Sequence, residues 1–473
     1  MSKAGSDAEV GRMVLQIVLP FDEEASDTAS AAESDAPQPS GAATPAGQGR
    51  PRRRKWYSLY DKVFSLKNLS AAWAKVRSNR GAPGCDGQTI EQFASHDEAN
   101  LQALHEQLKA KTYHPRPVKR VEIPKPGGGT RPLGIPTVRD RIVQQAVLQI
   151  LQPIFEAKFS DYSHGFRPKR GCATALSIVD RAVKFGYEWI VDADIEKFFD
   201  TVDHEVLLDA LHEEVTDGSV LGLIRMFLES GVLLDGGELE PTELGTPQGG
   251  PLSPLLANIY LHPLDVAMKE NGCGLVRYAD DFVIFTKTRQ RAEEALELAT
   301  IVLGGLKLRL HPEKTHIAAI DEGFDFLGFR YFRDGRGMLQ KVVRRKSVQR
   351  FREAVRSRTK RHAGQKRPKP QRCTVRRLRK NQRVQEMVAA LNRYLRGWHW
   401  YFKGVATSWR DYFANFDKFV RRRLRSAISG RFAKGRWHTI LRNEDLRAIG
   451  LVSVTELQSS YEQGLLAAPP TSG

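Results

Sequence analysis

The segment from residue 277 to residue 285 combines apolar, strand-like residues with two adjacent acids, Asp280 and Asp281. Apolar runs on both sides of such a pair predict a β-hairpin whose tight turn presents the two carboxylates. Acids in a turn are usually only solvated turn formers. A second acidic segment upstream favours a chemical role instead.

That second segment is the strand-like run 189–195, which contains Asp192 and Asp194 and is followed by Glu196. Because the side chains of a strand alternate between its faces, the three acids are expected on one face. Placed beside the hairpin turn, that face would crowd several carboxylates together, which costs free energy unless a cation neutralises them. The spacing alone does not decide whether Asp192 or Asp194 would bind the cation.

Hard divalent cations prefer oxygen ligands, and Mg²⁺ is the ion that also binds substrate phosphates. Two such ions about 3.5–4 Å apart can activate an attacking 3′-hydroxyl and stabilise the leaving pyrophosphate. The expected cofactor is therefore a pair of Mg²⁺ ions, for which Mn²⁺ is a possible substitute. The chemistry that this predicts is nucleotidyl transfer.

Two loops rich in glycine and proline could bind a nucleotide beside the acids. The segment 245–254 ends in a Ser-Pro pair, which is typical of the N-cap and first turn of a helix. The segment 123–136 has a glycine tip and predicts a hairpin. From this hairpin Lys125 and Arg131 would project towards triphosphate oxygens. The planar guanidinium of Arg can donate two parallel hydrogen bonds, whereas the ammonium of Lys acts as a compact positive charge.

The elements that must hold these residues mix helices and strands. Helical periodicity is present at 66–76 and at 101–108, and a longer helix is predicted through 140–155. Strand-like runs follow at 189–195 and 275–285. The predicted fold class is therefore α+β.

The order of these motifs resembles the fingers and palm of a reverse transcriptase, and their amino-acid sequences are similar to those of the group II intron family. Residues 194–200 read Asp-Ile-Glu-Lys-Phe-Phe-Asp and match the first catalytic block, while Tyr-Ala-Asp-Asp at 278–281 matches the second. The resemblance implies that Asp194 and Asp280 are metal ligands and that Asp281 is a weaker one. It also implies a right-hand polymerase fold, in which an antiparallel palm sheet is followed by an α-helical thumb.

The same resemblance implies roles for five further residues around the nucleotide. Phe199 would lie against the sugar and exclude a ribose 2′-hydroxyl, and Gln248 would line the nucleotide and template pocket. Lys125 and Arg131 would bind the triphosphate. Lys314 would act as a general acid towards the departing pyrophosphate.

Residues that would bind nucleic acid lie before and after these motifs. The segment 163–171 is similar to the family's template-contacting loop, which makes Arg167 and Arg170 template contacts, whereas His164 is expected to be structural. The block 324–329 is similar to the family's primer-positioning block.

The region after residue 340 resembles the family's thumb, or maturase domain, which grips the template–primer duplex and the structured intron RNA. Residues 341–380 contain eighteen Lys or Arg and one acid, Glu353. Phosphate contacts from this stretch should weaken steeply with salt. The residues predicted to make them include Arg344, Arg345 and Lys346. Aromatic residues at helical spacing from Leu391 onwards predict a helical core more readily than base-stacking sites.

Composition and the motifs together suggest four parts. Residues 1–55 form an acidic, low-complexity extension that cannot bury enough apolar surface to order itself. Residues 56–335 would form the fingers and palm, 336–430 the helical thumb, and 431–473 a short DNA-binding-like segment and tail. The chain lacks the His/Cys-rich nuclease module of some family members, so we expect it not to cleave target DNA itself.

The charge balance agrees with a nucleic-acid partner. The 473 residues carry a net charge of +18, which attracts polyanions. Apolar runs do not approach the roughly 18 residues that span a bilayer, and no signal peptide is evident. The four cysteines stand far apart without a Cys-x-x-Cys pair, which argues against a disulfide framework or a structural zinc site. A cytoplasmic protein without a membrane partner is expected.

The predicted function is RNA-directed DNA polymerisation, with an RNA template, a DNA primer, a structured group II intron RNA and target DNA as partners. The protein would also assist the splicing and mobility of that intron. Two alternatives remain open at this stage. One is a related reverse transcriptase in a defence or other non-intron role. The other is an RNA-binding splicing cofactor without polymerase activity, which the intact set of aspartates disfavours.

Overall fold

The computed structural model describes residues 55–124, 129–234, 236–246, 249–360, 374–405, 409–429 and 441–464. The predicted extension 1–55 therefore lies, apart from Lys55, outside the described residues. The chain forms two compact units, and the second begins at Ala319. In the described parts of the chain, none of the helices combines the length and apolar character that crossing a membrane requires.

The first unit begins with helices that pack around one long, buried helix, α5. Helix α2 starts at Ser65, whose hydroxyl accepts from the amide of Asn68, and α5 starts at Thr137, whose hydroxyl accepts from the amide of Asp140. The three helices predicted from periodicity are confirmed as α2, α4 and α5. The helices of this part are α1 (Tyr60–Phe64), α2 (Leu66–Ser78), α3 (Ile90–Ala94), α4 (Asp97–Lys109) and α5 (Val138–Glu156).

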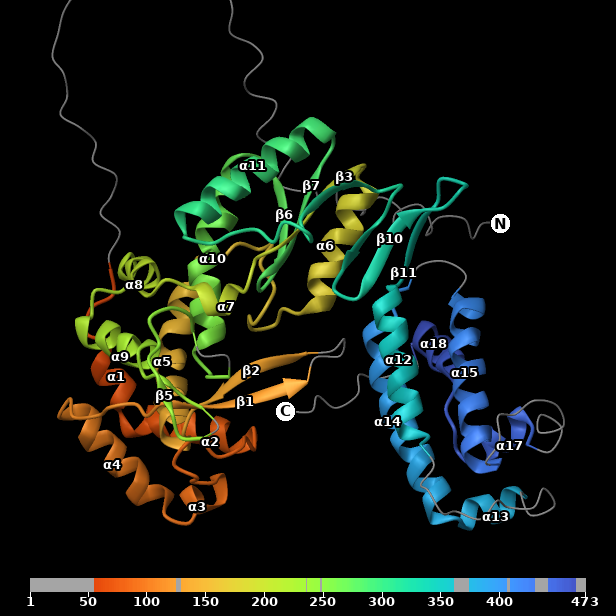
Figure 1. Ribbon diagram of the computed structural model, residues 1–473, viewed down its shortest axis with the longest axis horizontal. Coiled ribbons are helices and arrows are strands. Elements are labelled where there is room, and N and C mark those ends of the chain that lie inside the picture. The colour runs from red at the N-terminus through yellow and green to blue at the C-terminus, as the bar shows by residue number, and fades with distance from the viewer. Residues whose placement is uncertain are drawn as a thin grey trace, which may run out of the picture. The chain divides into compact units, whose positions relative to one another are not determined.

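The predicted hairpin is present as β1 (Val118–Pro124) and β2 (Thr130–Ile135), while residues 125–128 of its tip lie outside the described residues. The two strands are antiparallel, and Pro124 pairs with Thr130 at the end next to the tip (Figure 1). Strand β4 (Val232–Leu233) pairs in parallel with β1, and β5 (Leu239–Glu240) completes a sheet of order β2-β1-β4-β5.

A second sheet of order β6-β7-β3-β8 carries both acidic segments. Strand β7 pairs antiparallel with both β6 and β3, so the two acidic segments become neighbours although about ninety residues separate them. The apolar residues of β3 and β7 are buried. The strands are β3 (Trp189–Asp194), β6 (Gly274–Tyr278), β7 (Asp281–Thr286) and β8 (His316–Ala319).

Helices cover this sheet and join it to the rest of the first unit. Helix α11 contacts β3 and β7, while α6 and α10 contact β6. One continuous apolar cluster links α2 and α5 with α10 and the sheet. The helices are α6 (Cys172–Lys184), α7 (Phe198–Thr201), α8 (His204–His212), α9 (Gly218–Leu228), α10 (Ser253–Glu270) and α11 (Arg289–Gly305).

In the second unit, a small antiparallel sheet comes first in the sequence and a group of helices follows it. The sheet has the order β11-β10-β9 and contains the block 324–329. Its strands are β9 (Phe324–Phe326), β10 (Phe329–Arg333) and β11 (Leu339–Val343). Residues 319–335, which the sequence interpretation assigned to the palm, thus pack with the second unit.

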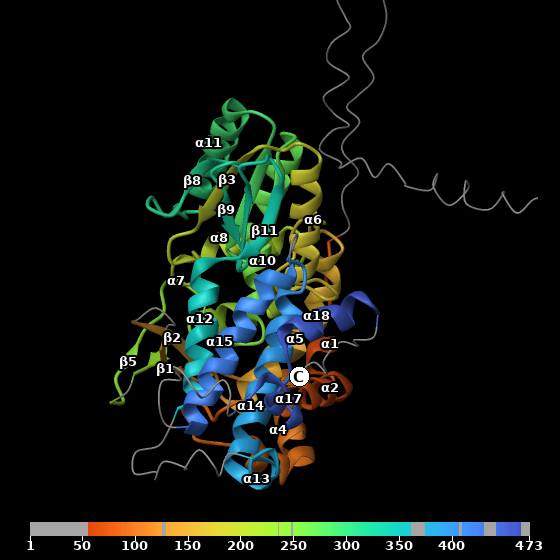
Figure 2. The same ribbon diagram turned by 90° about the vertical axis from the view of Figure 1, so that its right-hand side faces the viewer.

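The predicted aromatic core of the helical region is confirmed. Phe351, Trp398 and Phe416 meet with ring centroids 4.7–4.9 Å apart. These residues come from α12, α14 and α15, which run alongside one another in Figure 2. The helices are α12 (Arg345–Arg358), α13 (Val375–Lys380), α14 (Gln382–Phe402), α15 (Trp409–Ser429), α17 (Asn443–Ala448) and α18 (Val454–Glu462).

Candidate active site

The pairing of β3 with β7 brings the predicted catalytic acids together. Asp194, the last residue of β3, is the register partner of Asp281, the first residue of β7. Asp192 lies opposite Val283 instead. The structure therefore favours Asp194 over Asp192 as the acid that meets the hairpin turn, an alternative that spacing alone left open.

Asp280 lies in the turn itself. Tyr278 pairs with Asp281, so Ala279 and Asp280 form a two-residue hairpin turn. Ala279 has a φ of +60°, a left-handed conformation that costs an L-residue roughly 1–2 kcal/mol. The surrounding structure must therefore hold this turn in place.

Arg277 is one of the residues that hold the turn. Its side chain is fully buried and forms a bidentate pair with Asp265 of α10, at 2.7 and 2.5 Å. It also donates to Oδ1 of Asn258 and to the carbonyl oxygen of Ala279, both at 3.0 Å. A buried guanidinium thus ties the acidic turn directly to α10.

The segment 162–165 also packs against the turn, through backbone hydrogen bonds and a close approach at Gly165. The amide of His164 donates to the carbonyl of Arg277, and the amide of Arg277 donates to the carbonyl of Tyr162, each at 2.9 Å. A Cβ at Gly165 would collide with the backbone nitrogen of Ala279. Glycine at 165 is therefore required for this close approach, and the amide of Asn258 fixes its carbonyl at 2.8 Å.

The electrostatics of Asp280 reflect the crowding that the sequence predicts. Burial raises the pKa of Asp280, and the negative charge of Asp194 raises it further. The positive charges of Arg131 and Arg277 act in the opposite direction. Arg131, in β2, thus acts electrostatically on the acidic turn, and its contact with the triphosphate stays a prediction.

Lys314 reaches the same place from the segment that follows α11. The amide of Glu196 donates to the carbonyl of Arg309, and the amide of His311 donates to the carbonyl of Asp194. This pairing lays the segment beside the end of β3. Lys314 Nζ then lies 2.5 Å from Oδ2 of Asp194, as an exposed cation beside a half-buried carboxylate.

Phe199 lies immediately after β3, in the short helix α7. It is half-buried against the apolar cluster and meets Phe198 edge to face, with ring centroids 5.1 Å apart. The amide of Thr246 donates to the carbonyl of Phe199 at 2.8 Å, so the start of the segment 245–250 lies against the backbone of Phe199. At the other end of this loop, a Cβ at Gly249 would collide with the carbonyl oxygen of Gly134.

Two residues predicted to bind the nucleotide lie outside the described residues. Gln248 falls between Thr246 and Gly249, so the described parts of its loop approach both Phe199 and the end of β2. Lys125 belongs to the tip between β1 and β2.

Arg167 requires a correction. Its side chain is only 3% exposed, and its guanidinium donates to Glu156 at 2.8–3.2 Å and to the carbonyls of Ser160 and Ser163. Buried charged groups are normally paired in this way, and these bonds leave Arg167 no path to a template. The prediction that Arg167 contacts RNA is therefore wrong, and its role is to brace the loop 160–165. Arg170 is more exposed and pairs with Asp161 at 2.6 Å.

The three basic residues predicted to bind RNA lie at the start of α12 in the second unit. Arg344 is the N-cap residue, and Arg345 and Lys346 occupy the first turn and are exposed. Cations at the positive end of a helix are unfavourable by a few tenths of a kcal/mol. An anion bound there would relieve this cost, but the RNA contact itself stays a prediction.

Comparison with known proteins places this geometry in a family. Residues 123–331 match the model of the reverse transcriptase (RNA-dependent DNA polymerase), and residues 369–444 match the group II intron, maturase-specific domain. Protein YkfC of Escherichia coli is 35% identical over 306 residues, which cover 56% of this chain and 80% of YkfC. The chain belongs to the group II intron reverse transcriptase and maturase family.

Two other relatives of this chain are described as proteins encoded by introns. The group II intron-encoded protein LtrA of Lactococcus lactis subsp. cremoris is 43% identical over 210 residues, or 44% of this chain and 34% of LtrA. A putative COX1/OXI3 intron 2 protein of Saccharomyces cerevisiae is 34% identical over 205 residues, or 43% of this chain and 24% of that protein. The predicted family, the α+β class and the polymerase fold with a helical C-terminal region are thus confirmed.

Reverse transcriptases of this kind use divalent metal ions, and the acids of this chain offer the hard oxygen donors that such ions prefer. Asp194, Asp280 and Asp281 stand at the ends of adjacent strands, which fits a shared site. Among the described residues, no group of three acidic, histidine or cysteine side chains converges as a metal site. In this structure the ammonium of Lys314 neutralises Asp194 instead.

Three residues for which the sequence predicted no role hold the acidic turn in place. Arg277, Asp265 and Asn258 position the acidic turn, although they do not face a substrate. An arginine inside an apolar strand indicates a buried partner, because an unpaired buried charge is costly. The sequence does not reveal that this partner is Asp265, which lies on a helix that precedes the strand.

His164 provides a test of the structural role predicted for it. The buried ring accepts or donates at Nδ1 with Thr174 Oγ1 at 2.8 Å, and burial with the nearby charges of Arg170 and Arg167 lowers its pKa from 6.5 to about 4. The unfolded chain therefore binds a proton more readily, so this contribution to stability is complete above pH 6.5 and is lost as the pH falls towards 4.

We expect acidification from pH 7 to pH 5 to cost roughly 2 kcal/mol at His164. In His164→Gln the side chain cannot titrate, so the stability of the variant should fall less between these pH values. Urea unfolding of both proteins at each pH measures the difference. Identical losses in parent and variant would show that His164 does not titrate on unfolding.

Proposed function

We propose that this chain is an active RNA-directed DNA polymerase that extends a DNA primer on an RNA template. The observation that carries the proposal is the register of β3 with β7, which sets Asp194 against Asp281 beside the turn that holds Asp280. A cluster of acids in this position is costly unless cations neutralise it. Its presence supports retained catalysis over the alternative of a splicing cofactor without activity.

The three aspartates are the residues that would hold two Mg²⁺ ions, or Mn²⁺ in their place. Bound there, the two ions would activate the 3′-hydroxyl of the primer and stabilise the departing pyrophosphate. Arg131 and Lys125 would bind triphosphate oxygens. Gln248 would line the nucleotide and template pocket. The ammonium of Lys314, beside Asp194, can donate a proton to the pyrophosphate as a general acid.

Phe199 would select deoxynucleotides, because it stands in α7, shortly after the strand that carries Asp194, and its backbone carbonyl accepts from the amide of Thr246. In Phe199→Val the space for a 2′-hydroxyl opens. We expect ribonucleotide incorporation relative to deoxynucleotide incorporation to rise about 10- to 100-fold, the range over which a pocket discriminates one small group. Single-nucleotide extension with dCTP or CTP opposite G measures this ratio, and an unchanged ratio would remove the gate role of Phe199.

The proposed partners follow from the same family. The basic second unit would bind the structured intron RNA and assist its splicing, and target DNA would be the site of mobility. Arg170, Arg344, Arg345 and Lys346 are the proposed backbone contacts that remain after the correction at Arg167. We also propose that the protein acts in the cytoplasm, and that the first unit carries out catalysis while the second unit binds RNA.

The direct test of the proposal is extension of a DNA primer annealed to an RNA template by the full-length protein in Mg²⁺. We expect full-length product in Mg²⁺ and none after chelation with EDTA. Binding of the same RNA without any extension in Mg²⁺ or Mn²⁺ would favour the splicing cofactor instead.

A further inference from the structure

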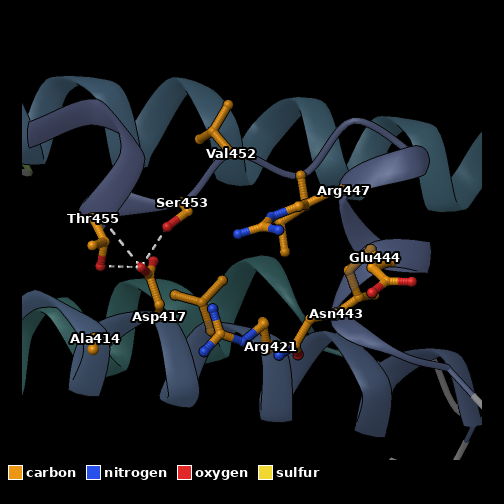
Figure 3. Close-up of a pocket in the computed structure, with 12 residues that line it drawn as sticks. Ala414, Asp417, Arg421, Asn443, Glu444, Arg447, Val452, Ser453 and Thr455 are labelled. Atoms are coloured by element: carbon orange, nitrogen blue, oxygen red, sulfur yellow. Dashed lines mark hydrogen bonds between the residues drawn. The ribbon is translucent and has the colours of Figure 1, made fainter. Parts of the chain in front are cut away.

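A cavity lies in the second unit, far along the chain from the catalytic acids. It is formed by α15, α17 and the segment that leads into α18, and its volume is about 370 Å³ (Figure 3). Pockets for small ligands begin at roughly 300 Å³, so this cavity can take one group of nucleotide size. The residues around it belong to no role assigned above.

Asp417 of α15 shows how the cavity is built. Its buried carboxylate accepts from the hydroxyls of Ser453 and Thr455, at 2.6 and 2.7 Å, and from the amides of Val454 and Thr455. These bonds fix the start of α18 against α15 (Figure 3). Because the carboxylate is satisfied in this way, it acts as an anchor and not as a ligand.

The walls of the cavity combine apolar and cationic groups. Val420 and Leu446, which are buried, give it an apolar side, and Val452 lines it from the segment before α18. Arg421 and Arg447 bring guanidinium groups from two different helices (Figure 3).

The two guanidinium groups differ in their partners. Arg447 pairs with Glu456 at 2.7 Å. Within the part of the chain that the structure describes, Arg421 forms no ion pair, although the carboxylates of Asp417 and Glu444 line the same cavity. The cavity thus holds a cation that a negatively charged ligand could neutralise.

We propose that this cavity binds one unpaired nucleotide of an RNA, a role that rests on the proposed function of the chain as an RNA-binding reverse transcriptase. The base enters the apolar side beside Val420 and Leu446, and its phosphate binds Arg421. Unstacked bases of RNA are commonly recognised by stacking on guanidinium planes and by hydrogen bonds to their edges. Asn443 and Glu444 at the rim offer polar groups for such bonds.

The test compares an unpaired RNA with a blunt RNA duplex of the same strand length. The variant Arg421→Gln removes the proposed phosphate contact, and Val452→Trp fills the cavity without changing charge. Lys418→Gln is the matched control, because Lys418 is an exposed cation on the same helix and does not line the cavity. Thermal unfolding establishes that each full-length variant is folded.

Because Arg421→Gln loses the charged contact to the phosphate and Val452→Trp takes up space that the base needs, we expect both to weaken binding of the unpaired RNA about 10-fold. Lys418→Gln should change it no more than about twofold, and all three should bind the duplex within about twofold of the parent. Equal losses for Arg421→Gln and Lys418→Gln on both RNAs would overturn the proposal, as would parent-like binding by folded Val452→Trp.

Primer extension by the parent protein, measured in parallel, separates this inference from the proposed function. Absence of extension would count against polymerase activity, while the binding comparison would still decide the role of the cavity.

Discussion

Replacing Asp280 with Asn is expected to lower primer extension on an RNA template by roughly 1,000-fold, while RNA affinity changes less than about twofold. Asn has the size of Asp but offers one neutral carbonyl oxygen in place of a charged carboxylate, so it binds a divalent ion much more weakly. The expected loss is large because Asp280 is one of the predicted metal ligands. It lies close enough to Asp194 for the negative charge of Asp194 to raise its pKa. Rates of extension under single-turnover conditions measure it.

The matched control for this variant is Asp209→Asn, an identical change at an exposed position on α8. It should extend the primer at the parental rate. If Asp280→Asn and Asp209→Asn were both as active as the parent, the assignment of Asp280 to catalysis would be wrong. A loss of RNA binding by Asp280→Asn would instead point to misfolding.

Replacing Arg277 with Met is expected to be the most destabilising of these changes. The ion pair of Arg277 with Asp265 is almost fully buried, with side chains 0% and 1% exposed. Removing one partner of such a pair costs about 3–5 kcal/mol, because the other charge stays buried without compensation. Urea unfolding should therefore show a much lower midpoint for the first unit.

A double variant separates stability from positioning at this pair. Replacing Arg277 with Met and Asp265 with Leu removes both buried charges, so most of the lost stability should return. Extension should stay low, because the bond from Arg277 to the carbonyl of Ala279 no longer holds the acidic turn. Full recovery of both stability and extension would contradict the positioning role.

The sequence was sufficient to predict the acidic hairpin because its signal is local. An apolar strand, a two-residue turn and a second apolar strand are contiguous, and alternation places Asp194 on the correct face. The choice between Asp192 and Asp194 needed the register of two strands that lie far apart in the chain. That register is decided by tertiary packing, so the resemblance to a family suggested the choice before the structure supported it.

Arg167 was predicted wrongly from the sequence, and the role of Arg277 was not predicted at all. Arg167 lies in a family-like motif, and its charge suggested a contact with nucleic acid. Each is buried instead by a partner that the motif does not contain, Glu156 for Arg167 and Asp265 for Arg277. Burial depends on which helix packs over a segment, and no periodicity within the segment reports that.

The helical region was predicted more fully, since its aromatic spacing follows the helix period. Phe351, Trp398 and Phe416 pack against one another as that spacing indicates. The cavity beside Arg421 was not predicted, because it depends on how Asp417 captures the start of α18. Contacts of this kind join two separate helices, so the sequence of neither helix contains a periodic pattern that would predict them.

The central claim, that carboxylates of two paired strands share two divalent ions, is tested most directly by locating those ions. The measurement is the anomalous scattering of Mn²⁺ in crystals of the protein with a primer, an RNA template and an incoming nucleotide. We predict two peaks about 3.5–4 Å apart that contact Asp194 and Asp280, with Lys314 released from Asp194. A map without manganese at these acids, in which Lys314 remains bonded to Asp194, would contradict the account.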